Sequence, residues 1–259
     1  MNELFNLLNE VSGFGRVAIW AWILVFLRVG AVMAFVPAFG EQIIPPRVRL
    51  GLAFAFSAVI APAVSPSIGA YDGALYLPMA VEILAGLTLG IGLRLFVIAL
   101  QIAATIIAQA TSLAQLFGGA TPDPQPAVGN LLTIAGLALA VSADLHVKVA
   151  EALILSYEFF PVTRFPPPSD MADWGVFHIG RAFGLGFTLA APFLIGSLVY
   201  NVALGVINRA MPQLMVAFVG APALTLGGLA LIALVLPLAL ALWLNAFGGF
   251  LSNPFQMAP

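Results

Sequence analysis

The chain has 259 residues, of which 62% are hydrophobic and only 8% are charged, and its mean hydropathy is +1.08. A soluble domain carries about 25% charged residues, so this composition excludes a water-covered globular protein and predicts burial in lipid, in partner proteins, or in both. The net charge is −2, which excludes a basic surface for nucleic acid. Cysteine is absent, which excludes disulfides, thiol catalysis and cysteine metal sites.

Six long apolar stretches predict an all-α membrane protein, organised as one membrane domain over residues 1–259. The stretches cover residues 17–39, 50–64, 77–117, 127–160, 179–207 and 214–247. No basic region precedes the first stretch as in a cleavable signal, so we expect that stretch to remain as an anchor. A spanning helix needs about 20 residues, so the second stretch is short for one span, and the third, fourth and sixth are too long.

The third stretch, 77–117, would form about 60 Å of helix, roughly twice the hydrocarbon thickness of a bilayer. No proline occurs within residues 79–121, so both a helical hairpin and one long helix are compatible with the sequence. Helix-ending Pro, Gly and Asp mark the connections at 40–49, 65–78, 118–126 and 161–175.

The segment "INRAMPQLMVAF" (207–218) places a compact polar group between two of the most apolar stretches. Six spans would put Arg47, Arg49 and Arg209 on one side of the membrane, and Arg16 and Arg164 on the other. This difference is a weak orientation signal. Together with the unusual stretch lengths, it indicates a topology other than a conventional series of spans.

Enzyme signatures are absent from the sequence, so we expect no catalytic site, no metal and no cofactor. No HExxH zinc motif or phosphate-binding Gly-rich loop occurs. His146 lies in a ladder with Asp144, Lys148 and Glu151, whose spacing is typical of a solvated or partner-facing helix surface.

Three charges, Arg28, Glu82 and Arg94, lie inside apolar stretches and are expected to be buried. An ion at this depth is costly and normally takes a partner. Glu82 and Arg94 are separated by about 18 Å along a helix and by about 120° around it, so each needs a partner elsewhere. We hypothesise that Arg28 pairs with Glu82. The alternative is that Arg28 extends to water because its segment never lies in lipid.

Two pairs of glycines spaced four residues apart, Gly86 with Gly90 and Gly180 with Gly184, would let a neighbouring helix approach closely.

A polar stripe follows one face of the helix predicted around residues 100–117. It consists of Gln101, Thr105, Gln109, Ser112 and Gln115, within about 120° of the helix circumference. Such a stripe either bonds neighbouring helices or lines a wet passage, so these residues are candidates for channel lining. The stripe leads into a candidate gate or plug loop that contains Leu113, Phe117, Gly118 and Gly119.

The order of several motifs resembles the FliR family of flagellar and type III secretion export-gate proteins, whose virulence-type counterparts are the SctT proteins. The most specific motif is G-x-x-N-R-x-x-P-Q with two following positions, present as Gly205, Asn208, Arg209, Pro212, Gln213, Gly220 and Pro222. The N-terminal motif at Arg28 and Gly30, "GLAF", E-x-x-x-G-x-x-x-G at Glu82, and "SYEFFP" at 156–161 follow in the family's order.

The resemblance implies a channel-forming structural component of the flagellar type III protein export gate, needed for flagellum assembly. Its long kinked helical hairpins would pack with FliP-like and FliQ-like subunits into one hetero-oligomeric helical assembly. FlhB-like and FlhA-like proteins, unfolded exported flagellar proteins and membrane lipid would be its other partners. The expected location is the bacterial inner membrane at the flagellar basal body, with part of the assembly at periplasmic level.

The segment 208–213 would then be a turn between two long helices of a hairpin. A stand-alone secondary transporter or small channel is the alternative, although the halves show no internal repeat of the kind that transporters carry.

Overall fold

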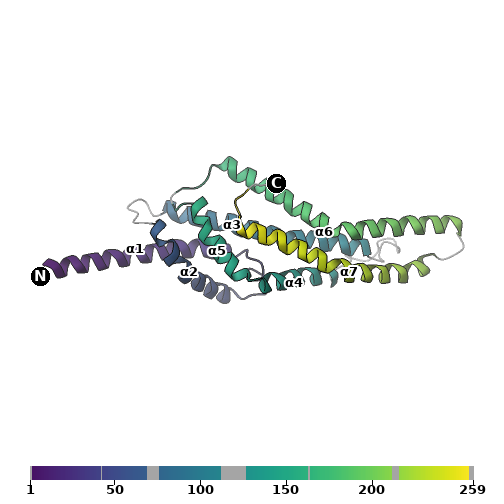
Figure 1. The fold of residues 1–259 in the computed structure, drawn as a ribbon, viewed down its shortest axis with the longest axis horizontal. Helices are drawn as coiled ribbons and strands as arrows, with labels where there is room; N and C mark the ends of the chain where they lie inside the picture. The colour runs from purple at the N-terminus through teal and green to yellow at the C-terminus, as the bar shows by residue number, and fades with distance from the viewer. Residues whose placement is uncertain are drawn as a thin grey trace. The chain divides into compact units, whose positions relative to one another are not determined.

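The computed structural model describes residues 2–41, 43–68, 76–111, 127–162, 164–211 and 216–256. Over these residues the chain forms seven α-helices and no strand (Figure 1). The helices are α1 (Asn2–Met33), α2 (Pro46–Ile68), α3 (Tyr76–Thr111), α4 (Ala127–Ser142), α5 (Leu145–Phe159), α6 (Pro168–Ala210) and α7 (Val216–Ser252). The expectation of an all-α membrane protein is therefore confirmed.

Four of the described helices are long and apolar enough to cross a membrane. They cover Pro46–Pro66, Tyr76–Ala110, Pro168–Ala210 and Pro222–Ser252. Both α2 and α6 begin with a proline, which suits the first helical position because its backbone N–H needs no partner there.

The third apolar stretch forms one continuous helix over the described residues, whereas the fourth is broken into two helices. The third forms α3, a single helix of 36 residues, so one long helix is correct and a hairpin within residues 76–111 is not. The fourth is broken into two helices, α4 and α5. The break occurs at Asp144, whose φ of 60° is left-handed and interrupts the helical path.

Residues 208–210 of the expected turn at 208–213 belong to the last turn of α6, so this helix extends further than expected. Helix α6 ends at Ala210 and α7 begins at Val216. The two helices lie side by side after this connection (Figure 1). Pro212 and Gln213 of the motif lie outside the described residues.

The chain divides into two compact units. The first contains Met1–Arg94, Ala143–Phe177 and Gly248–Pro259, and the second contains Leu95–Ser142 and His178–Phe247. Helices α3, α6 and α7 each contribute one part to each unit.

In the first unit, the connection between α1 and α2 is held by backbone contacts. Ala38 adopts a φ of 68°, and Gly40 approaches so closely that a Cβ there would lie 2.8 Å from the Ala34 oxygen. The Arg49 guanidinium donates to the carbonyl oxygens of Glu41 and Ile44, at distances of 3.1 to 3.3 Å. These bonds fix the entry into α2.

The C-terminal segment after α7 folds against the same unit. The Trp174 indole donates to the Pro254 carbonyl oxygen at 2.9 Å. The Phe255 ring contacts the rings of Phe159 and Phe160, with centroid distances of 5.1 and 4.6 Å. Pro254 and Phe255 are therefore part of the packed structure around the end of α5.

In the second unit, small residues let α4 and α6 approach α3. A Cβ at Gly136 would lie 2.5 Å from Leu100, and a Cβ at Gly186 would lie 2.8 Å from Ile102. Helix α7 is joined to α3 through the fully buried Trp243, whose indole donates to the Phe96 carbonyl oxygen at 2.8 Å.

Candidate functional site

A buried charge cluster lies in the first unit, centred on Arg28 of α1. Arg28 and Glu82 of α3 are both 0% exposed. The guanidinium donates to both carboxylate oxygens, with Nε–Oε2 at 2.7 Å and Nη2–Oε1 at 2.9 Å. The hypothesis that Arg28 pairs with Glu82 is confirmed as a contact, and the alternative that Arg28 extends to water is wrong.

The end of α5 supplies the remaining partners of Arg28. Its Nη2 donates to the Phe160 carbonyl oxygen at 2.7 Å, and its Nη1 donates to Ser156 Oγ at 2.9 Å. The Ser156 hydroxyl can accept this bond because its own proton goes to the Leu153 carbonyl oxygen. Arg28 thus connects α1, α3 and α5.

The Tyr157 side chain closes the cluster. Its hydroxyl donates to Glu82 Oε2 at 3.1 Å, and its ring centroid lies 3.6 Å from the guanidinium carbon of Arg28. This geometry adds a cation–π contact to the ion pair. A buried ion pair is stable only when its other hydrogen-bonding positions are also satisfied. Because the bonds described here satisfy them, the cluster has a structural role: it holds α1, α3 and α5 together.

Two glycines of the E-x-x-x-G-x-x-x-G motif explain how Glu82 reaches Arg28. A Cβ at Gly86 would overlap the Arg28 carbonyl oxygen, and one at Gly90 would lie 3.1 Å from Phe35. The motif therefore places α1 directly against α3, and Glu82 lies one helical turn before the point of closest approach. The second glycine pair behaves differently, because a Cβ at Gly180 or Gly184 would meet no described atom within 4 Å.

Arg94 is not buried, which corrects the expectation from sequence. Its side chain is 29% exposed and pairs with Glu41, 26% exposed, at 2.6 Å between Nη1 and Oε1. The partner lies in the connection between α1 and α2. Sequence reasoning correctly required a partner outside α3 but did not find Glu41.

The charged ladder on α5 lies at the surface. Asp144, His146 and Glu151 are exposed, as expected for a solvated or partner-facing helix. Among the residues that the structure describes, no group of three or more His, Asp or Glu side chains could hold a metal ion.

The described part of the polar stripe lies on one exposed face of α3, in the second unit. Gln101, Thr105 and Gln109 are exposed, whereas Ala103 and Ile107 are buried. The Thr105 hydroxyl donates within the helix to the Gln101 carbonyl oxygen at 2.9 Å. Within the described part of the chain, these three side chains thus form a polar surface on α3.

Several predicted site residues lie outside the described ranges. They are Ser112 and Gln115 of the stripe, Leu113, Phe117, Gly118 and Gly119 of the candidate gate loop, and Pro212 and Gln213 of the family motif.

The other residues of the family motif lie near the ends of α6 and α7 that the connection joins. Gly205, Asn208 and Arg209 are exposed on α6. Gly220 of α7 packs against α6, where a Cβ would lie 2.5 Å from the Tyr200 hydroxyl and 3.1 Å from Leu204. Pro222 is exposed. Gly220 therefore has a packing role within the hairpin, and the exposed members are available to other molecules.

Sequence reasoning missed the α5 partners of Arg28. Ser156, Tyr157 and Phe160 all belong to the "SYEFFP" motif. That motif contains two hydroxyl side chains next to an apolar run. It could therefore have indicated that this segment supplies polar partners for the buried Arg28 and Glu82.

Comparison with known proteins places this chain in a family. Residues 19–250 match the family described as "Bacterial export proteins, family 1". The "Flagellar biosynthetic protein FliR" of Caulobacter vibrioides is 37% identical over 229 residues, which cover 86% of this chain and 91% of that protein.

Relatives with the same name occur in distant bacteria. The Escherichia coli protein is 30% identical over 82% of this chain and 82% of its own length. The Bacillus subtilis protein is 28% identical over 78% of this chain and 80% of its own length. With the membrane-length helices and the motif order described above, these matches establish that the chain belongs to the FliR family of flagellar biosynthetic export proteins.

Proposed function

We propose that the chain is a channel-forming structural subunit of the flagellar type III protein export gate, without a catalytic role. The observation that carries this proposal is the family match over residues 19–250, because it spans nearly all of the described helices. The proposed location is the bacterial inner membrane at the flagellar basal body.

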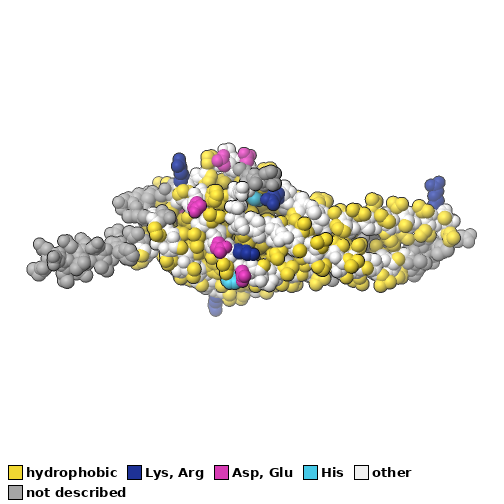
Figure 2. Space-filling view, in the orientation of Figure 1, with side chains coloured by type: hydrophobic (Ala, Val, Ile, Leu, Met, Phe, Trp, Pro, Cys, Tyr) yellow, Lys and Arg dark blue, Asp and Glu magenta, His cyan; other side chains and the backbone are white. Residues whose placement is uncertain are grey.

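The surface of the second unit supports assembly with other subunits. On α6, Ile195, Leu198 and Val202 are 63%, 65% and 59% exposed, and on α7, Leu234 and Leu238 are 77% and 73% exposed. The visible face of these helices is hydrophobic with very little charge (Figure 2). Large contiguous apolar surfaces mark contacts with proteins or lipid.

The proposed neighbours are FliP-like and FliQ-like subunits in one hetero-oligomer, with FlhB-like and FlhA-like proteins at its cytoplasmic side. Tagged FliP-like and FliQ-like subunits should co-purify this chain as one particle visible by electron microscopy. A purified chain that transports a small solute without these partners would favour the stand-alone transporter instead.

The exposed stripe on α3 is the proposed contact with unfolded exported flagellar proteins. The chain contains no cysteine, so single cysteines can be introduced without background. Thr105→Cys on the stripe should crosslink to an export substrate arrested in the gate. Thr88→Cys is the matched control, because Thr88 forms the same bond within α3, to the Leu84 carbonyl oxygen, but lies outside the stripe.

Equal crosslinking at both positions would argue against a lining role for the stripe.

The gate role of residues 113–119 stays a prediction. Deleting this loop should raise ion leak through the assembled gate, and an unchanged leak would refute it.

A further inference from the structure

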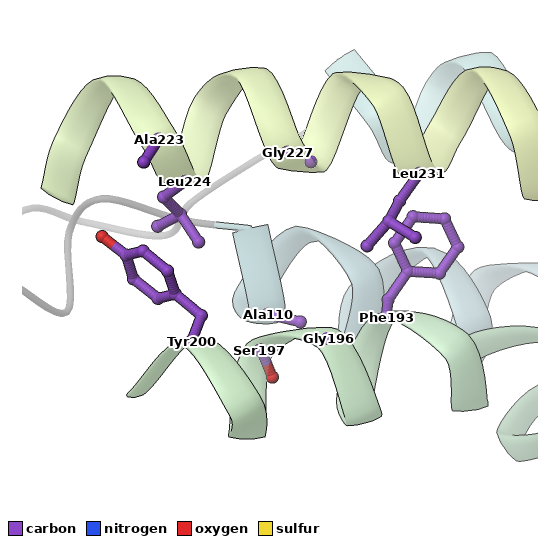
Figure 3. Close-up of a pocket in the computed structure, with 10 residues that line it drawn as sticks. Ala110, Phe193, Gly196, Ser197, Tyr200, Ala223, Leu224, Gly227 and Leu231 are labelled. Atoms are coloured by element: carbon purple, nitrogen blue, oxygen red, sulfur yellow. The ribbon is translucent and has the colours of Figure 1, made fainter. Parts of the chain in front are cut away.

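At the level of the polar stripe, α3 is packed between helices of the second unit. Leu100 meets a glycine of α4, and Ile102 meets a glycine of α6. Near the end of α3, Ala110 lines a small cavity together with residues of α6 and α7 (Figure 3). Gln101 lies between the first two contacts and, nine positions before Ala110, about 180° from it around the helix. The described helices therefore pack against the other sides of α3 and leave the side of Gln101 exposed.

The exposed side of α3 carries the three described residues of the stripe, Gln101, Thr105 and Gln109. Charged residues are absent from residues 95–111 of α3, from α4, and from α6 between Arg181 and Arg209. Hydrogen bonds, and not ion pairs, are therefore the polar interactions that these side chains offer to a ligand.

The stripe offers both donors and acceptors. A glutamine carboxamide carries two N–H donors and one acceptor oxygen, so it can bond to an N–H and a C=O at the same time. Thr105 contributes differently, because its hydroxyl proton already goes to the Gln101 carbonyl oxygen at 2.9 Å, and its own oxygen remains an acceptor. These groups match the polypeptide backbone, in which each residue other than proline has one N–H and one C=O.

The spacing of the stripe matches an extended chain. Residues four positions apart on an α-helix are separated by about 6 Å along its axis. In an extended polypeptide, the N–H and C=O of every second residue point to the same edge, and two residues span about 6.6 Å. From Gln101 to Gln109 the mismatch is about 1 Å, which flexible side chains can take up. An extended chain that lies along α3 can therefore meet all three side chains with the same edge.

We infer that the stripe binds exported polypeptides through their backbone, in extended conformation, and without regard to their side-chain sequence or charge. This inference rests on the proposed contact between the stripe and exported proteins, and it specifies which atoms are recognised. A shift of the bound chain by two residues restores the same set of bonds, so this binding does not prevent the chain from moving along α3.

The inference can be tested in the intact assembly that carries Thr105→Cys, because this variant keeps both glutamines. An export substrate is arrested in the gate by a folded domain at its C-terminus, and single cysteines are placed at successive positions of its extended stretch. A mild oxidant then forms disulfides, which require the two Cα atoms to lie within about 7 Å. The disulfide yield should be high at every second substrate position and low between them, because successive residues of an extended chain point to opposite faces.

Removing both carboxamides, in Gln101→Leu with Gln109→Leu, should abolish the alternation. Asn201→Leu is the matched control, because it also removes an exposed carboxamide, but on α6 and outside the stripe. Co-purification of the subunits must show that each variant assembles. Equal yields at neighbouring substrate positions, or an alternation that survives the loss of both glutamines, would overturn backbone binding and leave the proposed contact in place. The absence of disulfides at every substrate position would overturn both.

Discussion

Removing the positive charge at the centre of the buried cluster should strongly destabilise the first unit. In Arg28→Met, the apolar stem is largely kept, but the four hydrogen bonds to Glu82, Ser156 and Phe160 are lost. The Glu82 carboxylate would remain 0% exposed, with the Tyr157 hydroxyl as its remaining bond from this cluster.

The expected loss of stability in Arg28→Met follows from the burial of the Glu82 carboxylate. Breaking a buried ion pair by removing one partner costs about 3–5 kcal/mol, because the other charge is left uncompensated. The Arg94–Glu41 pair is the internal control, since its distance is similar but its side chains are 29% and 26% exposed. An exposed pair contributes about 0–1 kcal/mol, so Arg94→Met should cost much less.

Thermal unfolding in mild detergent, followed by tryptophan fluorescence, would compare the two variants. A difference of about 3 kcal/mol corresponds to roughly a hundredfold change in the ratio of folded to unfolded protein. Arg28→Met with Glu82→Gln should recover part of the loss, because no isolated charge remains. The reversed pair Arg28→Glu with Glu82→Arg should not recover it, because the new carboxylate would face the Phe160 carbonyl oxygen.

Equal destabilisation by Arg28→Met and Arg94→Met would refute the argument from burial. Full recovery by the reversed pair would show that charge neutrality alone matters, and that the bonds to α5 contribute little.

Two further predictions concern helix contacts, and a third concerns the polar stripe on α3. Gly86→Ala should lower the melting temperature, because the added Cβ would overlap a backbone oxygen. Gly180→Ala should leave the melting temperature unchanged, because its Cβ would meet open space. Equal melting temperatures of the two variants would contradict this prediction. Gly220→Ala should destabilise the hairpin by about 1 kcal/mol or more through overpacking, and Tyr200→Phe should restore part of that loss in a double-mutant cycle, since the hydroxyl is the nearest atom. Thr105→Leu should reduce secretion of flagellar proteins into the medium at unchanged protein level, and normal secretion would argue against a polar passage.

Composition and apolar length were sufficient to predict an all-α membrane protein. Side-chain hydropathy is a local property, so the sequence indicated that residues 76–111 are helical and apolar, but it did not decide between a hairpin and the single helix α3. The need for partners of Arg28 and Glu82 was also predictable, because an isolated ion in an apolar environment is costly wherever it lies.

Only the tertiary structure decided which partners meet. Arg28 contacts residues 54 and 128 positions away, and this depends on how α1, α3 and α5 pack, which hydropathy does not encode. The break at Asp144 was likewise not visible as a proline or glycine. Identical glycine spacings at Gly86 and Gly180 have different environments for the same reason: spacing determines which side chains share a helix face, whereas packing determines what that face contacts.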